Sequence, residues 1–396
     1  MPSLTQSALE KLFAAVKVGG FTVVWPDGTK RTYGPDRSEF TLTIKDPRAI
    51  SLMVRNISLG FGESYMDGLI DIEGDLRDVI ALPHRNRAAF PQYANRSFFK
   101  LMRGVTLGVK PAAQRKAVQH HYDIGNAFYE LWLDETMSYS CAYFKQKTDP
   151  LAKAQRQKID HTLRKLQLRP GQRLLDIGCG WGWLIITAAK QYKVKATGIS
   201  QSAEQVKKVK ERIKAEGLEH LVEVKLADYR ELTGSETYDR IVSVGMFEHV
   251  GRPHHDEYFA AVSRLIKPGG ISVLHTITTD YERPTDPWIA KYIFPSSYIP
   301  SWREVIAKLP DHSLHLTDVE SLRIHYAMTL DHWGENFEKN LDKVRTMFDE
   351  RFVRMWRLYL AASGSSFRNS GLDLHQFVFT KGLNNDLPLT REFLYK

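Results

Sequence analysis

Cysteine and long apolar runs are scarce in this chain, and both absences narrow what it can be. The sequence of 396 residues contains two cysteines, Cys141 and Cys179. They are too few for a disulfide framework and predict reduced thiols in a cytoplasmic protein. No run of about 18 or more apolar residues occurs, so no segment is predicted to span a membrane. The N-terminal residues lack the apolar core of a secretory signal.

Acidic residues are missing from one long stretch. Between Val79 and Tyr122 there is no Asp or Glu, and the chain as a whole carries a net charge of +9. Aromatic residues are interleaved with cationic ones there: Phe90, Tyr93, Phe98 and Phe99 among Arg85, Arg87, Arg96, Lys100, Arg103, Lys110, Arg115 and Lys116. This composition suits an anionic membrane surface, a nucleic-acid backbone or a solvated segment between domains. Charge alone does not decide among these three interpretations.

The length of the chain predicts more than one domain, because a single hydrophobic core rarely serves so many residues. We divide the chain into an N-terminal domain over residues 1–82, a basic linker over residues 83–118 and a catalytic domain over residues 119–396.

The N-terminal domain is predicted to be a small α/β accessory domain. Asp27-Gly28 separates two strand-like runs, 21–25 and 30–33, and this spacing predicts a hairpin. A strand over 40–44 and a helix over 47–56 follow. No group of residues in this domain suggests catalysis.

A glycine-rich motif, Arg173-Leu-Leu-Asp-Ile-Gly-Cys-Gly-Trp-Gly182, organises the rest of the chain. It predicts a buried strand, a turn in which backbone approaches a ligand closely, and a helix from Trp183. A dinucleotide fingerprint needs Gly-x-Gly-x-x-Gly to seat a pyrophosphate, and the spacing here is Asp-x-Gly-x-Gly-x-Gly. This pattern suits a cofactor that has a cationic centre and no phosphate. It resembles the first motif of S-adenosylmethionine-dependent methyltransferases.

Strands and helices alternate after this motif, which predicts a parallel, doubly wound sheet with its ligand at the carboxyl ends of the strands. Further strands are expected over 194–199, 222–226, 238–244, 271–277 and 376–380, and helices over 151–166, 203–216, 256–266, 321–337 and 340–362. Ser202 and Gln205 form a potential capping box. Residues beyond Thr278 are rich in aromatics and proline and are expected to cover the site.

Four side chains stand out by type and position: Cys141, Glu248, His275 and Tyr326. Each alone has an ordinary structural explanation, because a buried thiol, a helix-capping carboxylate, a core histidine and a packed tyrosine are all common.

Six stretches together resemble the cyclopropane-fatty-acyl-phospholipid synthases and their mycolic-acid relatives. They are His121-Tyr-Asp-Ile-Gly-Asn-Ala-Phe-Tyr129, Tyr139-Ser-Cys-Ala-Tyr143, Leu175-Asp-Ile-Gly-Cys-Gly-Trp-Gly182, Val244-Gly-Met-Phe-Glu-His-Val-Gly251, Tyr292-Ile-Phe-Pro-Ser-Ser-Tyr-Ile-Pro300 and Tyr326-Ala-Met-Thr-Leu-Asp-His-Trp333. The resemblance is strong over residues 119–396. The N-terminal part is similar, with weaker motifs, to the lipid-associated domain of the bacterial enzymes. It implies a class I Rossmann-like methyltransferase fold with a small α/β domain in front.

The resemblance also implies a set of residues that bind S-adenosylmethionine. Gln205 would reach the ribose hydroxyls, Asp228 would accept from the adenine amine, and Tyr229 would offer its ring face. The family often has Thr-Leu where this chain has Ser200-Gln201, which makes the ribose contacts differ. The complete set is Tyr139, Ser140, Asp176, Gly178, Gly180, Ser200, Gln201, Gln205, Asp228 and Tyr229.

The catalytic residues implied by the resemblance are Cys141, Glu248, His275, Tyr326 and the backbone N–H of Ile277. In the family they hold a bicarbonate ion, and no metal site is predicted. Attack of an alkene on the sulfonium methyl leaves a carbocation, and the new methyl must lose a proton before a three-membered ring closes. An oriented oxyanion can stabilise the cation and take that proton.

The implied activity is transfer of a methylene to unsaturated acyl chains of membrane phospholipids. The implied enzyme is a homodimer in the cytoplasm, bound peripherally to the inner face of the membrane through the basic linker. Three alternatives remain: a fatty-acyl C-methyltransferase giving branched products, a small-amine N-methyltransferase, and a non-catalytic lipid-binding protein. A nucleic-acid partner is not expected, because Gly245-Met-Phe-Glu248 stands where an Asn-Pro-Pro-Tyr-type motif would follow the fourth strand.

Overall fold

The computed structural model describes residues 3–90 and 124–395. The chain forms two compact units. The first contains the N-terminal residues together with two later segments, Thr285–Pro295 and Leu330–Gly371. The second contains residues 124–284 with Ser296–Thr329 and the chain from Leu372. Residue 119 and most of the basic linker lie outside the described residues, whereas residue 82 lies inside the range 3–90. The predicted boundaries at residues 82 and 119 stay predictions.

The first unit contains a four-stranded sheet in the order β2-β1-β3-β4. Its strands are β1 (Phe21–Val24), β2 (Lys30–Tyr33), β3 (Thr41–Ile44) and β4 (Ile70–Glu73). The predicted hairpin is confirmed: β1 and β2 are antiparallel, and the Trp25 N–H donates to the Thr29 carbonyl at 2.9 Å. Gly28 has φ +84°, the left-handed conformation that glycine adopts without a steric penalty.

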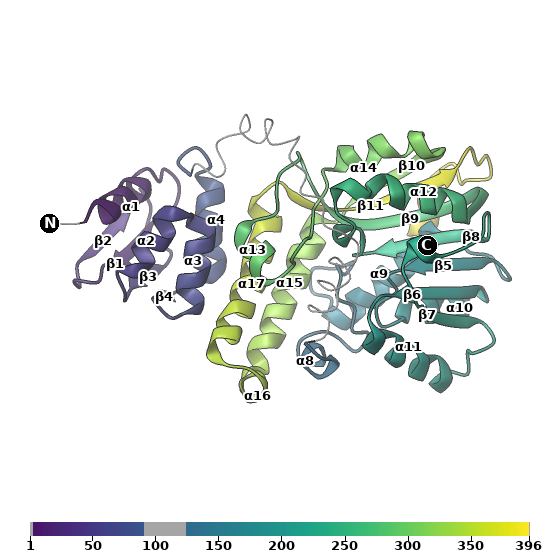
Figure 1. Ribbon diagram of the computed structural model, residues 1–396, viewed down its shortest axis with the longest axis horizontal. Helices are drawn as coiled ribbons and strands as arrows, with labels where there is room; N and C mark the ends of the chain where they lie inside the picture. The colour runs from purple at the N-terminus through teal and green to yellow at the C-terminus, as the bar shows by residue number, and fades with distance from the viewer. Residues whose placement is uncertain (1–2, 91–123, 396) are drawn as a thin grey trace. The chain divides into compact units, whose positions relative to one another are not determined.

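Helices pack beside this sheet, and sequence analysis missed four helices of this unit: α1 (Leu4–Ala14), α3 (Ile57–Met66), α4 (Leu76–Arg85) and α13 (Pro287–Tyr292). The others in this unit are α2 (Arg48–Arg55), α16 (Leu341–Met347) and α17 (Glu350–Asn369). Helix α17 lies against α3 and α4 (Figure 1).

The single helix expected over 340–362 is wrong, because the chain breaks between α16 and α17. Phe348 has extended backbone, and the Asp349 carboxylate accepts from the Phe352 N–H at 2.8 Å. Asp349 therefore caps a new helix.

The second unit is built on a seven-stranded sheet in the order β10-β11-β9-β8-β5-β6-β7. The strands are β5 (Arg173–Ile177), β6 (Lys195–Ser200), β7 (Val222–Leu226), β8 (Tyr238–Val244), β9 (Ile266–Thr279), β10 (Leu314–Ser321) and β11 (Leu372–Lys381). The five strands β5 to β9 are parallel, as predicted, and β11 and β10 extend the sheet antiparallel. Strand β10 was not predicted. The strand order reverses between β5 and β8, and ligands bind at such a switch point.

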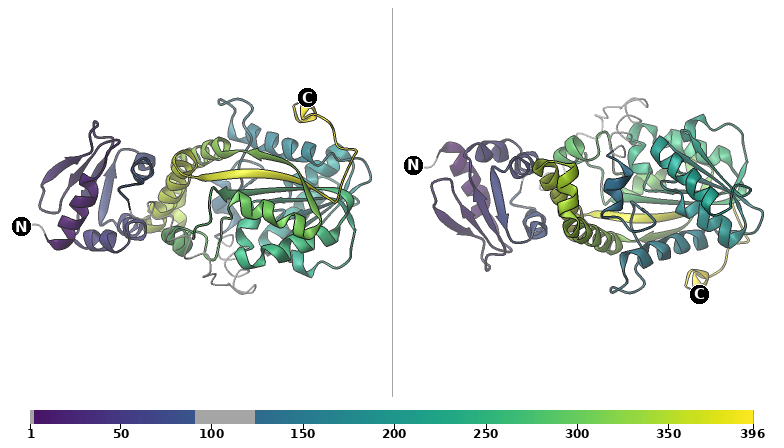
Figure 2. Two further views of the ribbon diagram at one scale, coloured as in Figure 1. Left: turned by 90° about the horizontal axis from the view of Figure 1, so that it is seen from above. Right: turned by 90° about the horizontal axis from the view of Figure 1, so that it is seen from below.

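Helices cover both faces of this sheet, as Figure 2 shows. They are α9 (Leu151–Lys165), α10 (Trp183–Tyr192), α11 (Ala203–Ala215), α12 (His255–Leu265) and α14 (Trp302–Lys308). Helix α8 (Asn126–Glu130) belongs to the second unit, and α15 (Arg323–Lys339) begins there and continues into the first unit from Leu330. Apolar side chains fill one core on each face, one around Ile185 and Val209 and the other around Phe259 and Phe377. This is the doubly wound arrangement predicted from the sequence, so the fold class is confirmed. No helix in the described ranges is both long and apolar enough to cross a bilayer.

The helix expected over 256–266 is confirmed within one residue, but the strand expected to begin at residue 271 begins at Ile266. Helix α12 ends at Leu265, and the Lys267–Gly270 segment already belongs to β9. Ile266 pairs with Tyr238, after which the register shifts before Arg240 pairs with Ile271. The Pro-Gly-Gly sequence therefore forms an irregularity within a strand, where glycine is also common.

Candidate active site

The glycine turn after β5 has the conformation that its sequence predicts. Gly178, Gly180 and Gly182 all have positive φ, at +87°, +53° and +85°. A Cβ atom built on Gly182 would lie 2.7 Å from the Val209 side chain, so helix α11 packs directly against the turn. Glycine is therefore required at Gly182 by both backbone conformation and space.

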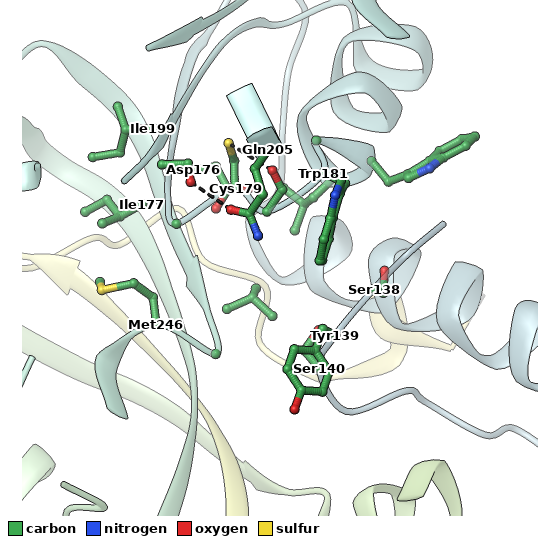
Figure 3. A pocket seen from close by; sticks show the side chains of 18 of the residues that line it. Ser138, Tyr139, Ser140, Asp176, Ile177, Cys179, Trp181, Ile199, Gln205 and Met246 are labelled. Atoms are coloured by element: carbon green, nitrogen blue, oxygen red, sulfur yellow. Dashed lines mark hydrogen bonds between the residues drawn. The ribbon is translucent and has the colours of Figure 1, made fainter. Parts of the chain in front are cut away.

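A cavity lies at the carboxyl ends of β5, β6 and β8, next to this turn (Figure 3). Nine of the ten predicted cofactor residues line it: Tyr139, Ser140, Asp176, Gly178, Gly180, Ser200, Gln201, Gln205 and Tyr229. Asp228 is the one that does not. Sequence analysis missed other lining residues, among them Lys158, Trp181, Met246 and His249.

Asp176 provides a buried negative group at the cavity. Its side chain is 2% exposed, and its Oδ1 has no hydrogen-bond partner among the described residues. Burial raises the pKa of this carboxyl to about 7, against the opposing effect of the Lys158 charge. Desolvation disfavours the carboxylate, so a cationic or hydrogen-donating ligand would stabilise it.

Lys158 holds the segment opposite Asp176. It extends from α9, is 4% exposed, and its Nζ donates to Ser140 Oγ at 2.9 Å. Gln155, one turn earlier, donates to the Ser140 carbonyl at 2.9 Å. Burial lowers the pKa of Lys158 to about 8. No sequence signal marks this lysine, because the pattern of α9 is that of an ordinary amphipathic helix.

Polar side chains after β6 and β7 are already bonded to one another. Ser200 Oγ donates to Gln205 Oε1 at 2.7 Å, so the side chain of Gln205 does not complete the capping box that its sequence position suggests. Gln201 Nε2 donates to Asp228 at 2.7 Å, and Arg230 donates to the same carboxylate through Nε at 2.9 Å. The predicted contact of Asp228 with an adenine amine stays a prediction, since its oxygens serve Arg230 and Gln201 here.

An aromatic cluster borders the cavity next to these polar groups. The Tyr129 ring lies 5.5 Å from both Tyr139 and Trp181, and 5.6 Å from Trp132. Trp181 Nε1 donates to Asn126 Oδ1 at 2.9 Å, which fixes its ring. Asn126 and Tyr129 belong to the His121–Tyr129 motif, whose residues 121–123 lie outside the described ranges. Aromatic faces here suit a cationic ligand.

Glu248 is the first of the predicted catalytic residues, and it is buried beside β9. One oxygen, Oε1, accepts from the Ile277 N–H at 2.7 Å, and Oε2 has no partner among the described residues. Burial raises the pKa of this carboxyl, and the bond from Ile277 partly opposes the rise. The Ile277 N–H was expected to face an anion. In this structure it holds Glu248.

His275 lies two residues before Ile277 on β9 and is completely buried. Its Nδ1 is 3.0 Å from Gln376 Nε2 on β11, the residue directly opposite in the strand pairing. Its Nε2 has no partner among the described residues. Burial holds the pKa of His275 well below its usual range, and the charges of Lys158 and Lys165 add to this.

Cys141 and Tyr326 both contact the backbone carbonyl of Leu322, and Leu322 is itself hydrogen-bonded to β11. The Leu322 carbonyl lies 3.8 Å from Cys141 Sγ and accepts from the Tyr326 N–H at 3.1 Å. The Leu322 N–H donates to the Leu374 carbonyl at 2.7 Å, and Leu374 is paired with Ile277. Burial raises the pKa of the Cys141 thiol well above its usual range, so it is a neutral thiol.

The two groups of residues are neighbours in the chain although they do not share the cavity wall. None of the five predicted catalytic residues lines the cavity, but Ser140 precedes Cys141, and Met246 and His249 flank Glu248. The turn after β8 and the segment before Ala142 thus each contribute residues to the cavity wall and one of the predicted catalytic residues. The residue types do not select a metal: among the described residues no three His, Cys, Asp or Glu side chains are grouped to hold one.

Comparison with known proteins extends this picture. Residues 109–377 match the family described as "Mycolic acid cyclopropane synthetase", and residues 8–95 match a domain of unknown function, DUF7884. The chain is 40% identical to the cyclopropane-fatty-acyl-phospholipid synthase of Escherichia coli K12 over 88% of this chain and 90% of that one. It is 37% identical to a probable fatty acid methyltransferase of Pseudomonas putida over 93% and 95% of the two chains.

Among solved structures, mycolic acid cyclopropane synthase CmaA1 in complex with SAH and CTAB is similar to this chain. It has a TM-score of 0.64 and 34% identity, and the match covers 69% of this chain and 99% of that one. The doubly wound sheet, the glycine turn and the cavity beside it define an S-adenosylmethionine-dependent methyltransferase. The chain belongs to the mycolic acid cyclopropane synthetase family.

Proposed function

We propose that this enzyme transfers a methylene group from S-adenosylmethionine to the cis double bond of unsaturated acyl chains in membrane phospholipids. The observation that carries the proposal is two buried polar atoms, Glu248 Oε2 and His275 Nε2, that have no hydrogen-bond partner among the described residues. Both side chains are connected to Ile277, because Glu248 Oε1 accepts from the Ile277 N–H and His275 lies two residues earlier on β9. Buried polar atoms without partners are rare in proteins. A small oxyanion such as bicarbonate fits this pair, since it can accept from an imidazole N–H and donate to a carboxylate.

The residues around the cavity would bind and orient the methyl donor. Asp176 supplies a buried carboxyl that a cationic ligand would hold in its ionised form, and Tyr129, Tyr139 and Trp181 supply aromatic faces. Ser200 and Gln205 supply groups for ribose hydroxyls. These contacts together would favour a ligand that carries a nucleoside and a sulfonium and lacks phosphate.

In the reaction, alkene electrons form a bond to the donor methyl carbon as the carbon–sulfur bond breaks, and the acyl chain becomes a carbocation. Bicarbonate, when bound, would accept the proton that the new methyl loses as the ring closes. His275 and Tyr326 would hold that base in place, and Glu248 would accept its remaining proton. Burial excludes water that would otherwise trap the cation.

The phospholipid and the membrane are supported by charge and by the relatives. The E. coli relative is named as acting on fatty-acyl phospholipids. Six of the eight cationic residues of the Val79–Tyr122 stretch lie outside the described ranges, so their contacts are a prediction. We propose that they bind anionic lipid at the inner face of the cytoplasmic membrane, and that the enzyme works as a homodimer there.

A second product is favoured by the P. putida relative, which is named a fatty acid methyltransferase. The same cation would then give a branched olefin if it lost a proton without ring closure, and a saturated methyl branch would need a hydride donor in addition.

The deciding experiment uses vesicles of monounsaturated phospholipid and S-adenosylmethionine with a trideuterated methyl group. The proposal expects acyl chains that gain one methylene, keep two deuterium atoms and lose the double bond in mass spectrometry. A branch or a new olefin would move the function to the second product. Transfer only to small amines, with no labelled lipid, would overturn the lipid substrate altogether.

A further inference from the structure

A chain of buried hydrogen bonds connects His275 to helix α9. Gln376 Nε2 lies 3.0 Å from His275 Nδ1 and 3.1 Å from Thr162 Oγ1. Thr162 Oγ1 in turn donates to the Lys158 carbonyl at 2.8 Å. The side chains of His275, Gln376 and Thr162 are completely buried. Water therefore has no access through which it could replace any of these bonds.

The direction of every bond in this chain follows from the single hydroxyl hydrogen of Thr162. Because that hydrogen is given to the Lys158 carbonyl, the hydroxyl oxygen can only accept from Gln376. The atom of Gln376 near Thr162 must then be the amide nitrogen. Its second N–H is directed to His275 Nδ1, which must be an acceptor and carry no proton. A neutral imidazole in this state has its hydrogen on Nε2.

The opposite amide orientation would be less favourable. It would put the NH2 group where Gln376 Oε1 now has no partner among the described residues, and two donors would be left unsatisfied in place of one acceptor. It would also make Thr162 choose between the Lys158 carbonyl and Gln376 for its one hydrogen. The local contacts thus select one amide orientation and, through it, one histidine tautomer.

We propose that Gln376, oriented by Thr162, is a positioning residue that fixes His275 as the Nε2–H tautomer, so that His275 donates a hydrogen bond to the oxyanion beside Glu248. The proposal rests on the function proposed above for the role of that anion. The tautomer itself does not depend on it.

The tautomer matters because His275 has only one N–H to offer. Complete burial and the charges of Lys158 and Lys165 keep the imidazole neutral, as its depressed pKa indicates. With the proton on Nδ1, the unpartnered Nε2 would present a lone pair, and an anion placed next to it would be repelled. The fixed amide of Gln376 is therefore as necessary for hydrogen-bond donation from Nε2 as the imidazole of His275 itself.

The test reads the tautomer directly, by nitrogen-15 NMR of the histidine rings in the full-length protein, with a His275→Ala sample to identify the signals. We expect the wild-type signals of an Nε2–H imidazole. Gln376→Glu offers only acceptors once its carboxyl is ionised, so spectra recorded with rising pH should show the proton move to Nδ1. Gln376→Met keeps the shape without donors and should give a mixture. Thr162→Val should loosen the amide, and Thr162→Ser should restore it.

Activity is measured on the same proteins. For Gln376→Glu and Gln376→Met we expect kcat to fall by roughly 10- to 100-fold while the Kd for S-adenosylmethionine stays within about twofold, as for other positioning residues. Thr380→Val is the matched control, because Thr380 is buried on the same strand and its hydroxyl donates to the Gly382 carbonyl. It should change neither the tautomer nor kcat.

Three results would overturn the proposal: wild-type His275 with its proton on Nδ1, wild-type His275 doubly protonated at neutral pH, or a tautomer change in Gln376→Glu with kcat unaltered. Failure of the proposed function looks different, since then wild type and Thr380→Val would transfer nothing to lipid. The NMR comparison would still decide the tautomer. If Gln376→Met does not fold, the Thr162→Val and Thr162→Ser pair makes the same distinction.

Discussion

Glu248 Oε1 accepts a hydrogen bond from the Ile277 N–H at 2.7 Å, which fixes the carboxyl, while its buried Oε2 has no hydrogen-bond partner in the part of the chain that the structure describes. This relationship separates two roles within one side chain. One oxygen anchors the turn after β8 to β9, and the other is free for a ligand. A substitution that keeps the first and changes the second therefore isolates the chemical role.

Glu248→Gln should abolish ring formation and leave cofactor binding intact. The glutamine oxygen can still accept from Ile277, but an NH2 group replaces the oxygen that would accept a proton. We expect the rate of lipid modification to fall by at least about 100-fold, the usual size for loss of a positioned acid or base. Calorimetric titration should give an unchanged Kd for S-adenosylmethionine. His275→Ala should behave alike, and full activity in both variants would refute the assignment.

Asp176→Asn should change how stability depends on pH. The pKa of this carboxyl rises from 3.8 unfolded to about 7 folded, so the folded protein binds more protons between these values. Wild-type stability from this group is fully present below about pH 4 and is lost as the pH rises through about 7. Asparagine does not titrate. Urea unfolding from pH 5 to 8 should therefore show the unfolding free energy of the variant increasing relative to that of the wild type as the pH rises. If the two proteins had parallel plots of unfolding free energy against pH, the raised pKa of the buried carboxyl would be contradicted.

Gly182→Ala should destabilise the second unit through a clash as well as through strain. The added Cβ would lie 2.7 Å from Val209 at a φ of +85°. We expect a loss of about 2–4 kcal/mol in unfolding free energy, combining left-handed strain with overpacking. Gly217→Ala is the matched control, since Gly217 has φ +63° with open space around it. Adding Val209→Ala should recover part of the loss for Gly182→Ala. Equal losses at the two glycines would show that packing contributes nothing.

Binding to anionic vesicles should depend on the cationic residues outside the described ranges. Replacing these residues by glutamine should reduce binding, and raising salt should weaken the wild type, because surface charges are screened over about 8–10 Å at moderate ionic strength. The six residues are Arg96, Lys100, Arg103, Lys110, Arg115 and Lys116.

The control for the vesicle experiment replaces Arg85 and Arg87. Arg85 pairs with Glu39 at 2.8 Å and Arg87 donates to the Asn369 carbonyl at 3.2 Å, both within the first unit. Losing them should leave vesicle binding nearly unchanged. Salt-independent binding in a sedimentation assay would argue against electrostatic docking.

The sequence predicts the parallel part of the sheet well because its signals are local. Asp176 and the glycines mark one strand end, and five apolar runs recur at regular spacing. Strand β10 has alternating burial with several polar residues, so its pattern is weak, and it becomes a strand only because β11 pairs with it. The sequence predicts one helix over 340–362 because the amphipathic pattern continues across Asp349, and only the structure shows that the Asp349 side chain caps a new helix.

The site shows the same limit. Residue type and motif position predict Glu248 and His275 as candidate catalytic residues. The roles of Lys158, Gln155 and Gln376 are visible only from hydrogen-bond partners that lie elsewhere in the chain. Gln376 is 101 residues from His275. A buried lysine or glutamine in an amphipathic segment has no local pattern of its own, since the neighbours that satisfy it are supplied by tertiary packing.

The position of β11 in the sheet also determines the order in which parts of the second unit can fold during synthesis. This strand lies between β9 and β10, and it brings Gln376 opposite His275. A chain still emerging from the ribosome can therefore pair β5 to β9 early, but β10 has no neighbour to join until residues 372–381 have been made. The glycine turn exists before then, whereas the partner of His275 does not. A nascent chain would therefore form its cofactor cavity first, and His275 would be held in the tautomer that donates from Nε2 only after β11 has been made.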